Sequence, residues 1–351
     1  MRVKLWPAFA LLLCLPTISV AADKLIFALD LIRHGDRTPI KALSTVDYKW
    51  KEGLGQLTAT GMHQEYEMGK QFRQRYVITE HLLPEHYERD TMYVRATDYE
   101  RTLMSAQSLL MGLYPAGSGP YIDDTGKPAL PNVMQPIPIR SAPGDHDAVI
   151  VHQIPPAEEE QLLQKYVYST PEWKQKETEN NKHFKRWGDA TGRKIERLTD
   201  VQLVGDALLI HKIHHVAMPA GLSDEDIDTI IGLNNWTFMA EKRPKAVSAA
   251  FSQQLVNNIA DFIEKGSKAN ARLKYVLLSA HDGTIASTLS ILGAPLDITP
   301  PYASDLNFSL YETDTRNYVV TVRYNGEPVS LPACGGTVCT LQQFIHAVRA
   351  G

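Results

Sequence analysis

Two stretches of this chain hold hydrophobic residues with no alternation of polar positions, and both predict buried strands. They are Lys24 to Ile32 and Lys274 to Ala280. Apolar runs of this kind are typical of strands that helices cover on both faces, as in a parallel sheet. Thr91 to Ala96 predicts a third, shorter strand. The pattern therefore indicates an α/β fold.

Apolar residues at helical spacing lie between and after these strands. They predict a helix from Thr60 to Tyr76. Thr97 to Glu100 has the form of a capping box, which predicts a second helix running to about Leu113. Three further helices are expected at Glu241–Glu264, Gly283–Leu292 and Thr340–Arg349.

The middle of the chain has a different character. Prolines are dense up to Pro156, and polar, charged stretches of helical pattern follow at Glu158–Tyr168 and Thr170–Trp187. This part predicts an inserted helical subdomain rather than a second sheet. We expect no internal repeat and no low-complexity tract in it.

The last two predicted strands, Asp305–Glu312 and Tyr318–Tyr324, are joined by a polar turn that favours an antiparallel pair. Together the elements predict a three-layer α/β core around a mainly parallel sheet. We expect this core from residues 23–118 and 238–351, with a helical cap from residues 119–237 inserted between them.

The first 22 residues have the features of a secretory signal peptide. Arg2 and Lys4 give a positive start, Ala8 to Leu15 is a short apolar run, and Val20 to Ala22 offers small residues for cleavage. The run is too short for a membrane span, and no later segment is apolar over the length that a span needs. We expect an exported protein, and the sequence leaves periplasm and full secretion open.

The formal net charge of the chain is −4 at neutral pH, and loss of Arg2 and Lys4 with the signal peptide makes it more negative. Such a surface does not attract nucleic acid or acidic membranes by its overall field. Any anion site must therefore be a local concentration of arginines.

Cys334 and Cys339 remain after the signal peptide, separated by Gly-Gly-Thr-Val. An exported protein meets oxidising conditions, and a short loop with two glycines brings two sulfurs within reach. A disulfide is the favoured interpretation. Zinc is the alternative, but only His346 is near as a further ligand.

The first predicted strand is followed by a concentration of charge, Arg33-His34-Gly35-Asp36-Arg37-Thr38-Pro39. Strand ends in open α/β sheets are where ligands usually bind, and two guanidiniums match a phosphate. The imidazole of His34 is a candidate nucleophile. A charged surface turn is the alternative interpretation of these seven residues.

Two other predicted strand ends carry matching chemistry and decide between these interpretations. Arg95 ends the second strand just before a helix, and His281-Asp282 ends the third at a helix N-terminus, which suits an anion. One carboxylate among this much positive charge suits phosphoryl transfer better than a structural turn.

The chain at this point resembles the histidine acid phosphatases, in the second branch of the histidine phosphatase superfamily, and is most similar to the prostatic and lysosomal type. The motif Arg-His-Gly-x-Arg-x-Pro is present as Arg33 to Pro39 and the His-Asp pair as His281-Asp282. Other similar segments are Gly55–Met62, Arg95–Ala106, which resembles the family's third-arginine segment, Pro301–Ser304 and Cys334–Cys339. The similarity fades through residues 145–235.

The resemblance implies a fold and a reaction. The fold is a three-layer α/β/α, phosphoglycerate-mutase-like core with an inserted, mainly helical cap. The reaction is hydrolysis of a small-molecule phosphomonoester, in which His34 attacks phosphorus and becomes phosphohistidine. Asp282 donates a proton to the leaving alcohol and then takes one from water. No metal and no cofactor are implied, because the phosphoryl oxygens are held by Arg33, Arg37, Arg95 and His281.

An acidic pH optimum is expected. Arginines around His34 disfavour the imidazolium and lower its pKa, while Asp282 must start the cycle protonated. A bound phosphate counters the first effect, so the value of the optimum stays open.

Alternatives remain for the function and for single residues. A phytase of the same family is the nearest, but many of these have Asn where this chain has Thr284. A phosphoglycerate-mutase-like transferase fits the signal peptide poorly, and an anion-binding protein that has lost catalysis needs a damaged site. Relatives of the prostatic type are often dimers, so a homodimer is expected by analogy alone.

Several charged residues near the motifs receive structural interpretations. Arg101 is expected to support the fold through an ion pair, and Asp36 to serve the turn or a neighbouring residue rather than act as a base. His211, His214 and His215 have helical spacing but no acidic partner at ligand spacing, and we interpret them as residues of the cap surface or cleft edge. Asp145-His146-Asp147 is interpreted in the same way.

Overall fold

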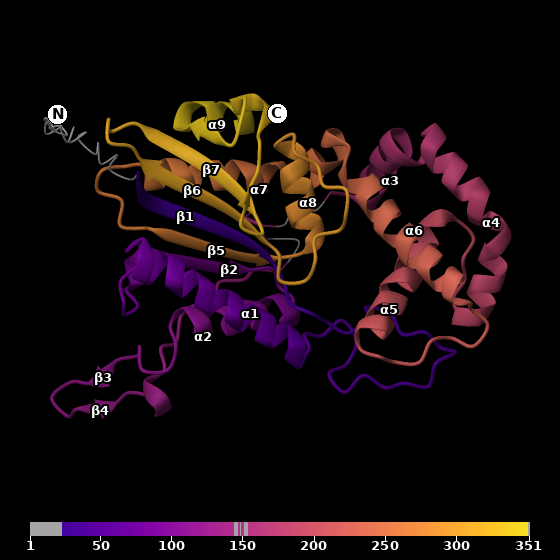
Figure 1. Ribbon diagram of the computed structural model, residues 1–351, viewed down its shortest axis with the longest axis horizontal. Helices are drawn as coiled ribbons and strands as arrows, with labels where there is room; N and C mark the ends of the chain where they lie inside the picture. Colours follow the sequence, from indigo (N-terminus) through magenta and orange to yellow (C-terminus); the bar gives the residue numbers. More distant parts are fainter. Residues whose placement is uncertain (1–22, 144–146, 148, 151–153, 350–351) are drawn as a thin grey trace, which may run out of the picture.

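The computed structural model describes residues 23–143, 147, 149–150 and 154–349 (Figure 1). The predicted signal peptide, residues 1–22, lies outside this part of the chain. Within it, no helix combines the length and apolar character that crossing a membrane requires.

One large sheet forms the centre of the body, with the strand order β2-β5-β1-β6-β7-β8, and β9 also pairs with β7. The strands are β1 (Lys24–Arg33), β2 (Met92–Ala96), β5 (Tyr275–Ala280), β6 (Asp305–Glu312), β7 (Tyr318–Tyr324), β8 (Glu327–Pro328) and β9 (Val338–Thr340). The expectation of a mainly parallel sheet is wrong. Only β1–β5 and β2–β5 are parallel, while β6 runs antiparallel to both β1 and β7. The short turn after β6 accounts for the β6–β7 direction, which the sequence predicted, because a parallel connection needs a long crossover.

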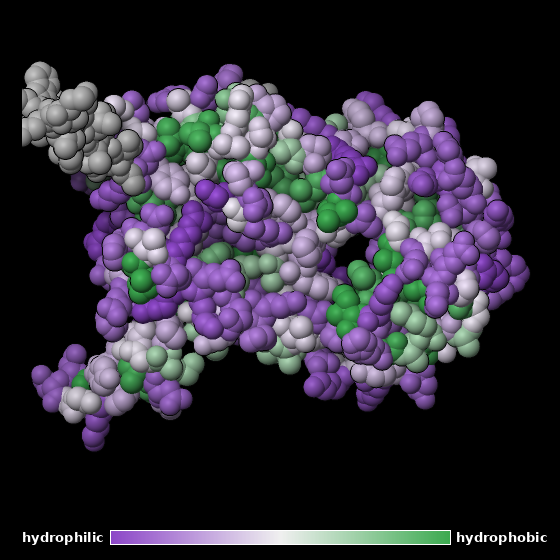
Figure 2. Space-filling model, in the orientation of Figure 1, coloured by the Kyte–Doolittle hydropathy of each residue, from purple (hydrophilic) through white to green (hydrophobic). Residues whose placement is uncertain are grey.

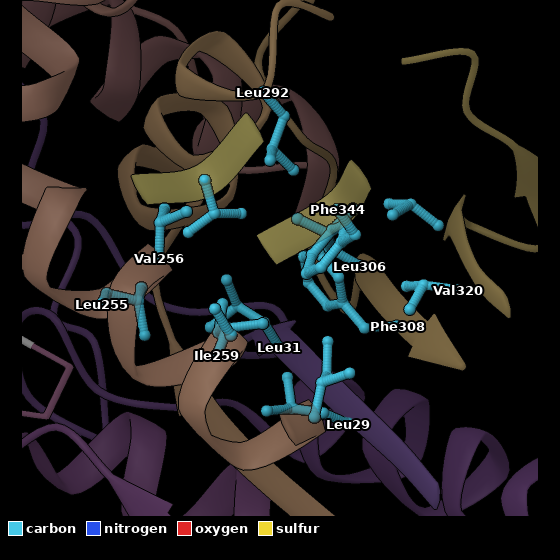
Figure 3. Packing of buried hydrophobic residues seen from close by; sticks show 14 of the residues in the cluster. Leu29, Leu31, Leu255, Val256, Ile259, Leu292, Leu306, Phe308, Val320 and Phe344 are labelled. Carbon is cyan, nitrogen blue, oxygen red and sulfur yellow. The ribbon is translucent and has the colours of Figure 1, made fainter. Parts of the chain in front are cut away.

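Helices cover both faces of the sheet, which gives the expected three layers (Figure 1). One face carries α1 (Ala59–Phe72) and α2 (Glu100–Leu113), and the other carries α7 (Lys245–Gly266), α8 (Asp282–Ile291) and α9 (Leu341–Arg349). β1 serves both layers: Ala28 and Ile32 pack toward α1 and α2. Leu29 and Leu31 pack with α7, as Figure 3 shows. β1 therefore is apolar almost throughout because both of its faces are covered.

The remaining helices form a separate cluster beside the body (Figure 1). They are α3 (Pro156–Leu163), α4 (Pro171–Thr191), α5 (Val201–Ile213) and α6 (Asp224–Lys242). Trp173, Trp187 and Leu208 belong to their own hydrophobic core.

The limits of the cap stay a prediction, but two features bear on them. The hairpin β3 (Tyr121–Ile122) and β4 (Lys127–Pro128) lies on the far side of the body from these helices (Figure 1). Arg140 then forms a parallel bridge with Arg95 of β2. Much of the segment before α3 is therefore associated with the body.

Two predicted helices differ from those observed. The expected helix Glu241–Glu264 is split at Pro244, which has no N–H to continue the hydrogen bonding of α6 and whose own backbone is extended. The expected capping box at Thr97 does not form, since its hydroxyl donates to Thr102 Oγ1 at 2.9 Å. Short 3₁₀ and π segments complete the chain at Arg73–Thr79, Arg89–Thr91, Pro131–Val133, Gln164–Tyr168, Leu198–Asp200 and Pro332–Cys334.

The predicted disulfide is present. Cys334 and Cys339 are bonded, with their Cα atoms 5.1 Å apart. The bridge links the 3₁₀ turn at Pro332–Cys334 to β9 and closes the end of the sheet.

Candidate active site

The candidate site lies where two neighbouring parallel strands end. Arg33 of β1 is in register with Ala280 of β5, so His34 and His281 leave the sheet side by side. Their ring centroids are 5.5 Å apart. The polar residues that follow these two apolar strands are thus brought together by the strand register alone.

His34 is held in a state that suits a nucleophile. Its side chain is buried, and Nδ1 lies 2.8 Å from the carbonyl oxygen of Gly35. A carbonyl only accepts, so Nδ1 carries the proton in the neutral ring and Nε2 keeps a lone pair. Burial lowers the pKa of His34 well below 6.5, and the charges of Arg33 and His281 lower it further.

The loop after His34 is fixed against the start of α1. A Cβ at Gly35 would lie 2.4 Å from the backbone oxygen of Gly61, so the two backbones meet only because both residues are glycine. Thr58 caps α1 by accepting from Gly61 N, and its hydroxyl donates to Asp36 at 2.5 Å. Asp36 therefore supports the loop, as expected.

Arg33 and Arg37 enter the site already paired with carboxylates. Nη2 of Arg33 lies 2.7 Å from Asp282 Oδ2, and the guanidinium lies over the ring of Tyr302. Arg37 donates two hydrogen bonds, of 2.9 and 3.1 Å, to Asp206 of α5. Each guanidinium is thus oriented by a fixed partner before a substrate arrives.

Asp282 begins α8. Burial raises the pKa of its carboxyl, but the guanidiniums of Arg33 and Arg37 outweigh this effect and hold the pKa below its usual value. Asp282 is therefore ionised in the substrate-free protein, contrary to the expectation that it starts protonated.

His281 faces the same cluster of cations. Burial lowers its pKa from 6.5 to about 3, and Arg101 is the largest charge that acts in the same direction. Nε2 of His281 lies 3.0 Å from Thr97 Oγ1, whose own proton is directed to Thr102. The arrangement favours His281 as the donor to Thr97, which fixes the orientation of its ring.

Arg95 and Arg101, the two arginines of the segment Arg95–Ala106, have different surroundings. Arg95 pairs with the buried carboxylate of Asp147 at 3.0 Å and also bonds Tyr93. Arg101, which was expected to form an ion pair, has no carboxylate partner among the described residues; its guanidinium reaches the carbonyl of Gly55 and lies over the ring of Tyr99.

A cavity of about 440 Å³ opens in front of His34. Among the described residues that line it, Arg101 is present and Arg95 is absent, and the polar set is His34, Arg37, Tyr99, Arg101, Lys242, Ser252, His281, Asp282, Thr284 and Ser287. Within the described chain, the buried Nε atoms of Arg33, Arg37 and Arg101 have no hydrogen-bond partner. Such donors are suited to an anion.

The histidine cluster has a structural role that the sequence did not reveal. His214 Nε2 lies 2.8 Å from Asp36 Oδ2, and the buried His211 bonds the carbonyl of Ala217 through Nδ1. The interpretation as a surface or edge residue is wrong for the buried His211, whereas His214 stays 20% exposed and His215 is exposed. Asp145 and His146 lie outside the described residues, whereas Asp147 is buried with Arg95. In the described ranges, no group of three or more acidic, His or Cys side chains forms a metal site.

Comparison with known proteins agrees with this geometry. The sequence model described as "Histidine phosphatase superfamily (branch 2)" matches residues 24–201 and 234–325. The chain belongs to this family. The matched ranges include every residue of the cavity's arginine and histidine cluster.

Relatives of known name extend along most of the chain. Lysosomal acid phosphatase of Xenopus laevis is 32% identical over 333 residues, covering 89% of this chain and 73% of the relative. Prostatic acid phosphatase of Homo sapiens is 30% identical over 348 residues, covering 94% and 86%. The Klebsiella sp ASR1 phytase structure has a TM-score of 0.67 at 17% identity, covering 93% and 95%, which shows a shared fold.

Sequence reasoning gave Arg101 and His214 other roles and did not single out Asp206. Arg101 lies in the segment that was singled out, six positions after Arg95, and its place at the start of α2 could have flagged it as facing the strand ends. Asp206 and His214 lie in and after α5, and no local pattern shows that this helix meets the loop at Asp36 and Arg37. Contacts between regions so far apart in sequence have no local signal.

Proposed function

We propose that this member of the histidine phosphatase superfamily is an acid phosphatase that hydrolyses phosphate monoesters through a phosphohistidine. The observation that carries the proposal is the state of His34. Its ring is neutral, bonded to Gly35 through Nδ1, and keeps a lone pair on Nε2; His34 lines one cavity together with Arg37, Arg101 and Asp282. The names of the lysosomal and prostatic relatives support the same activity.

The first step forms a bond between His34 Nε2 and phosphorus while the ester P–O bond breaks. The leaving oxygen takes a proton from Asp282. In the second step Asp282 removes a proton from water, whose oxygen attacks phosphorus as the P–N bond breaks. Phosphate leaves, and His34 returns to its neutral form.

Four cationic or hydrogen-bonding groups would hold the phosphoryl oxygens. We assign this role to Arg33, Arg37, Arg101 and His281, with Arg101 replacing Arg95 in the set expected from the sequence. The charge of the three guanidiniums stabilises the transition state in the way a divalent cation does in other phosphatases, and His281 joins them once a bound anion favours its imidazolium. Arg95 instead neutralises the buried Asp147.

The proton on Asp282 has to arrive with the substrate, because the carboxyl is ionised without it. A bound phosphate group adds negative charge beside Arg33 and Arg37, and this charge opposes their effect on the pKa of Asp282. Phosphate monoesters themselves carry a proton below a pKa of about 6. Both effects favour turnover at acid pH.

We also propose that the protein works after export, in the periplasm or outside the cell, and that it forms a homodimer. The first 22 residues and the lysosomal and prostatic relatives support export. The dimer rests on analogy with relatives of the prostatic type.

The decisive experiment is a covalent trap. The purified protein should hydrolyse p-nitrophenyl phosphate at pH 5 in the presence of EDTA, and an alkaline quench should capture one labelled phosphate on His34. His34→Ala should lose both signals, because no other group replaces the nucleophile. Turnover that needs an added metal, or a labelled residue other than His34, would overturn the proposal.

A further inference from the structure

A second cavity opens beside the phosphate site, between the α/β body and helices α5 and α6. Its volume is about 510 Å³. Arg37 and Asp282 line both cavities, whereas His34 lines only the first. Figure 2 shows a hollow between the body and these helices, with hydrophobic residues along its edge. We call the second cavity the apolar groove and define it by its apolar walls, Leu203, Leu209, Ile213, Ile231 and Ile298.

The geometry of the reaction assigns the leaving group to the apolar groove. In phosphoryl transfer the attacking and leaving atoms lie on opposite sides of phosphorus. The attacking atom belongs to His34, and the proton for the leaving oxygen comes from Asp282. The alcohol must therefore depart through a space that contains Asp282 and excludes His34, and the apolar groove meets both conditions.

The walls of the apolar groove are unusually hydrophobic for an exposed surface. Leu203, Ile213 and Ile298 remain 45%, 44% and 64% exposed, although each is a large aliphatic side chain. Leu203, Asp206, Leu209 and Ile213 follow one another at helical spacing on α5, so this face of α5 presents apolar side chains to the groove on both sides of Asp206. Contiguous exposed apolar surface of this kind is typical of sites that bind a ligand or a partner.

Two polar side chains of the apolar groove already have partners. Gln202 donates to Glu241 at 2.9 Å, and Asn235 accepts from the backbone of Thr299 at 2.8 Å. Among the described lining residues the only cations are Arg33 and Arg37, and both face carboxylates. The groove therefore offers no further charge to a substrate with a second phosphate, such as a polyphosphorylated inositol.

We propose that the apolar groove binds the alcohol part of the substrate and that preferred substrates are phosphate monoesters of linear alkyl alcohols. This inference rests on the proposed phosphatase activity. We expect the substrate to be a single molecule dispersed in water. The groove lies between two parts of the protein, so the alkyl group of a lipid would have to leave the bilayer to enter it.

The test is a homologous series of ethyl, butyl, hexyl and octyl phosphate, each below its micelle concentration. The alcohols have nearly equal acidity, so the chemical step is matched along the series. Each methylene that enters the apolar groove should raise kcat/KM about four-fold, the value expected from apolar transfer. If kcat/KM did not change along the series while ethyl phosphate was hydrolysed normally, the groove assignment would be overturned and the proposed phosphatase activity would stand. Absence of turnover with every ester, p-nitrophenyl phosphate included, would overturn both.

Variants locate the effect in the apolar groove. Leu203→Ser and Ile298→Ser should each lower the ratio of octyl to ethyl phosphate turnover several-fold, because they remove apolar area next to the chain. Ile78→Ser and Met111→Ser are controls, since these side chains are 48% and 49% exposed on the body away from the groove. An unchanged ratio in the groove variants would contradict the assignment.

A vesicle arm separates a dispersed substrate from one in a membrane. Hexadecyl phosphate in phosphatidylcholine vesicles should be hydrolysed more slowly than dispersed octyl phosphate at equal total concentration. Faster hydrolysis in vesicles would show that the lipid surface, rather than the groove, favours long chains.

Discussion

The α/β body and the helices α5 and α6 contribute opposite chemistry to one cleft. The body supplies the charged groups at the ends of β1 and β5 and at the start of α2. The helices supply mainly apolar side chains, together with Lys242 of α6 in the first cavity and one carboxylate, Asp206, on Arg37. In our proposal the body therefore acts on the phosphate, and the helices choose what is attached to it. Chemistry and selectivity can then be changed separately.

Replacing Asp282, the proposed general acid, is the strongest test that the body carries out the reaction on the phosphate. Asp282→Asn should lower kcat for alkyl phosphates about 10³-fold, because the alkoxide then leaves without a proton. The loss should be much smaller for p-nitrophenyl phosphate, whose leaving group needs no acid, provided that breakdown of phosphohistidine is not limiting. Steady-state rates with both esters measure the difference. Equal losses would place Asp282 in binding rather than proton transfer.

Substitutions of Arg95 and Arg101 test which of the two arginines belongs to the phosphate site. Arg101→Ala should lower kcat/KM for p-nitrophenyl phosphate about 10²- to 10³-fold, because a donor to the phosphoryl oxygens is lost. Arg95→Ala should leave kcat/KM within a few-fold of the original in the folded protein.

The effect of Arg95→Ala should appear in stability instead. It leaves the buried carboxylate of Asp147 without its partner, which should reduce the free energy of unfolding by about 3 kcal/mol. Urea unfolding measures this loss, and Arg101→Ala is the matched control. A large fall in activity with unchanged stability in Arg95→Ala would restore Arg95 to the phosphate site.

Much of the body could be predicted from sequence because its signals are local. β6 and β7 lie where the pattern put them, and β1 and β5 differ by one residue each. The strand ends were then enough to bring His34, Arg33 and Asp282 together. The sheet direction was missed because strand polarity depends on connections. The sequence did not show whether Arg95 or Arg101 serves the phosphate, because β2 and α2 each offered an arginine with no local sign of which one is paired.

The helical region was predicted only as helices. An amphipathic pattern shows that a helix has a buried face, but it does not identify the partner of the other face. Leu203 and Ile213 are apolar and exposed, so their pattern resembles an ordinary core stripe. The apolar groove and the pair between Asp206 and Arg37 arise from packing between distant segments, which no window of the sequence contains.

The buried His281 predicts how pH changes the free energy of unfolding. The pKa of His281 falls from about 6.5 in the unfolded chain to about 3 in the folded one, so the unfolded state binds more protons below pH 6.5. The stabilising contribution of His281 is present above pH 6.5 and is lost as the pH falls.

This contribution can be isolated by substitution. Between pH 7 and pH 5, His281→Asn should lose about 2 kcal/mol less of its free energy of unfolding than the original protein. Urea titrations of both proteins at each pH measure the difference. Saturating phosphate should shrink it, because an anion favours the imidazolium. Parallel pH profiles of the two proteins would show that His281 is already protonated in the folded state.

The smallest expected effect tests whether α5 contributes to phosphate binding through Asp206. Asp206 of α5 bonds Arg37 with both oxygens and holds the guanidinium at the junction of the two cavities. Asp206→Ala should lower kcat/KM about ten-fold, since Arg37 can then leave the orientation in which it meets the phosphoryl group. Asp206→Asn keeps one acceptor and should recover most of this loss. If Asp206 only stabilised the fold, both variants would lose stability while their inhibition by inorganic phosphate stayed unchanged. Weaker phosphate inhibition in Asp206→Ala, with recovery in Asp206→Asn, would instead show that α5 positions a phosphate ligand from outside the body.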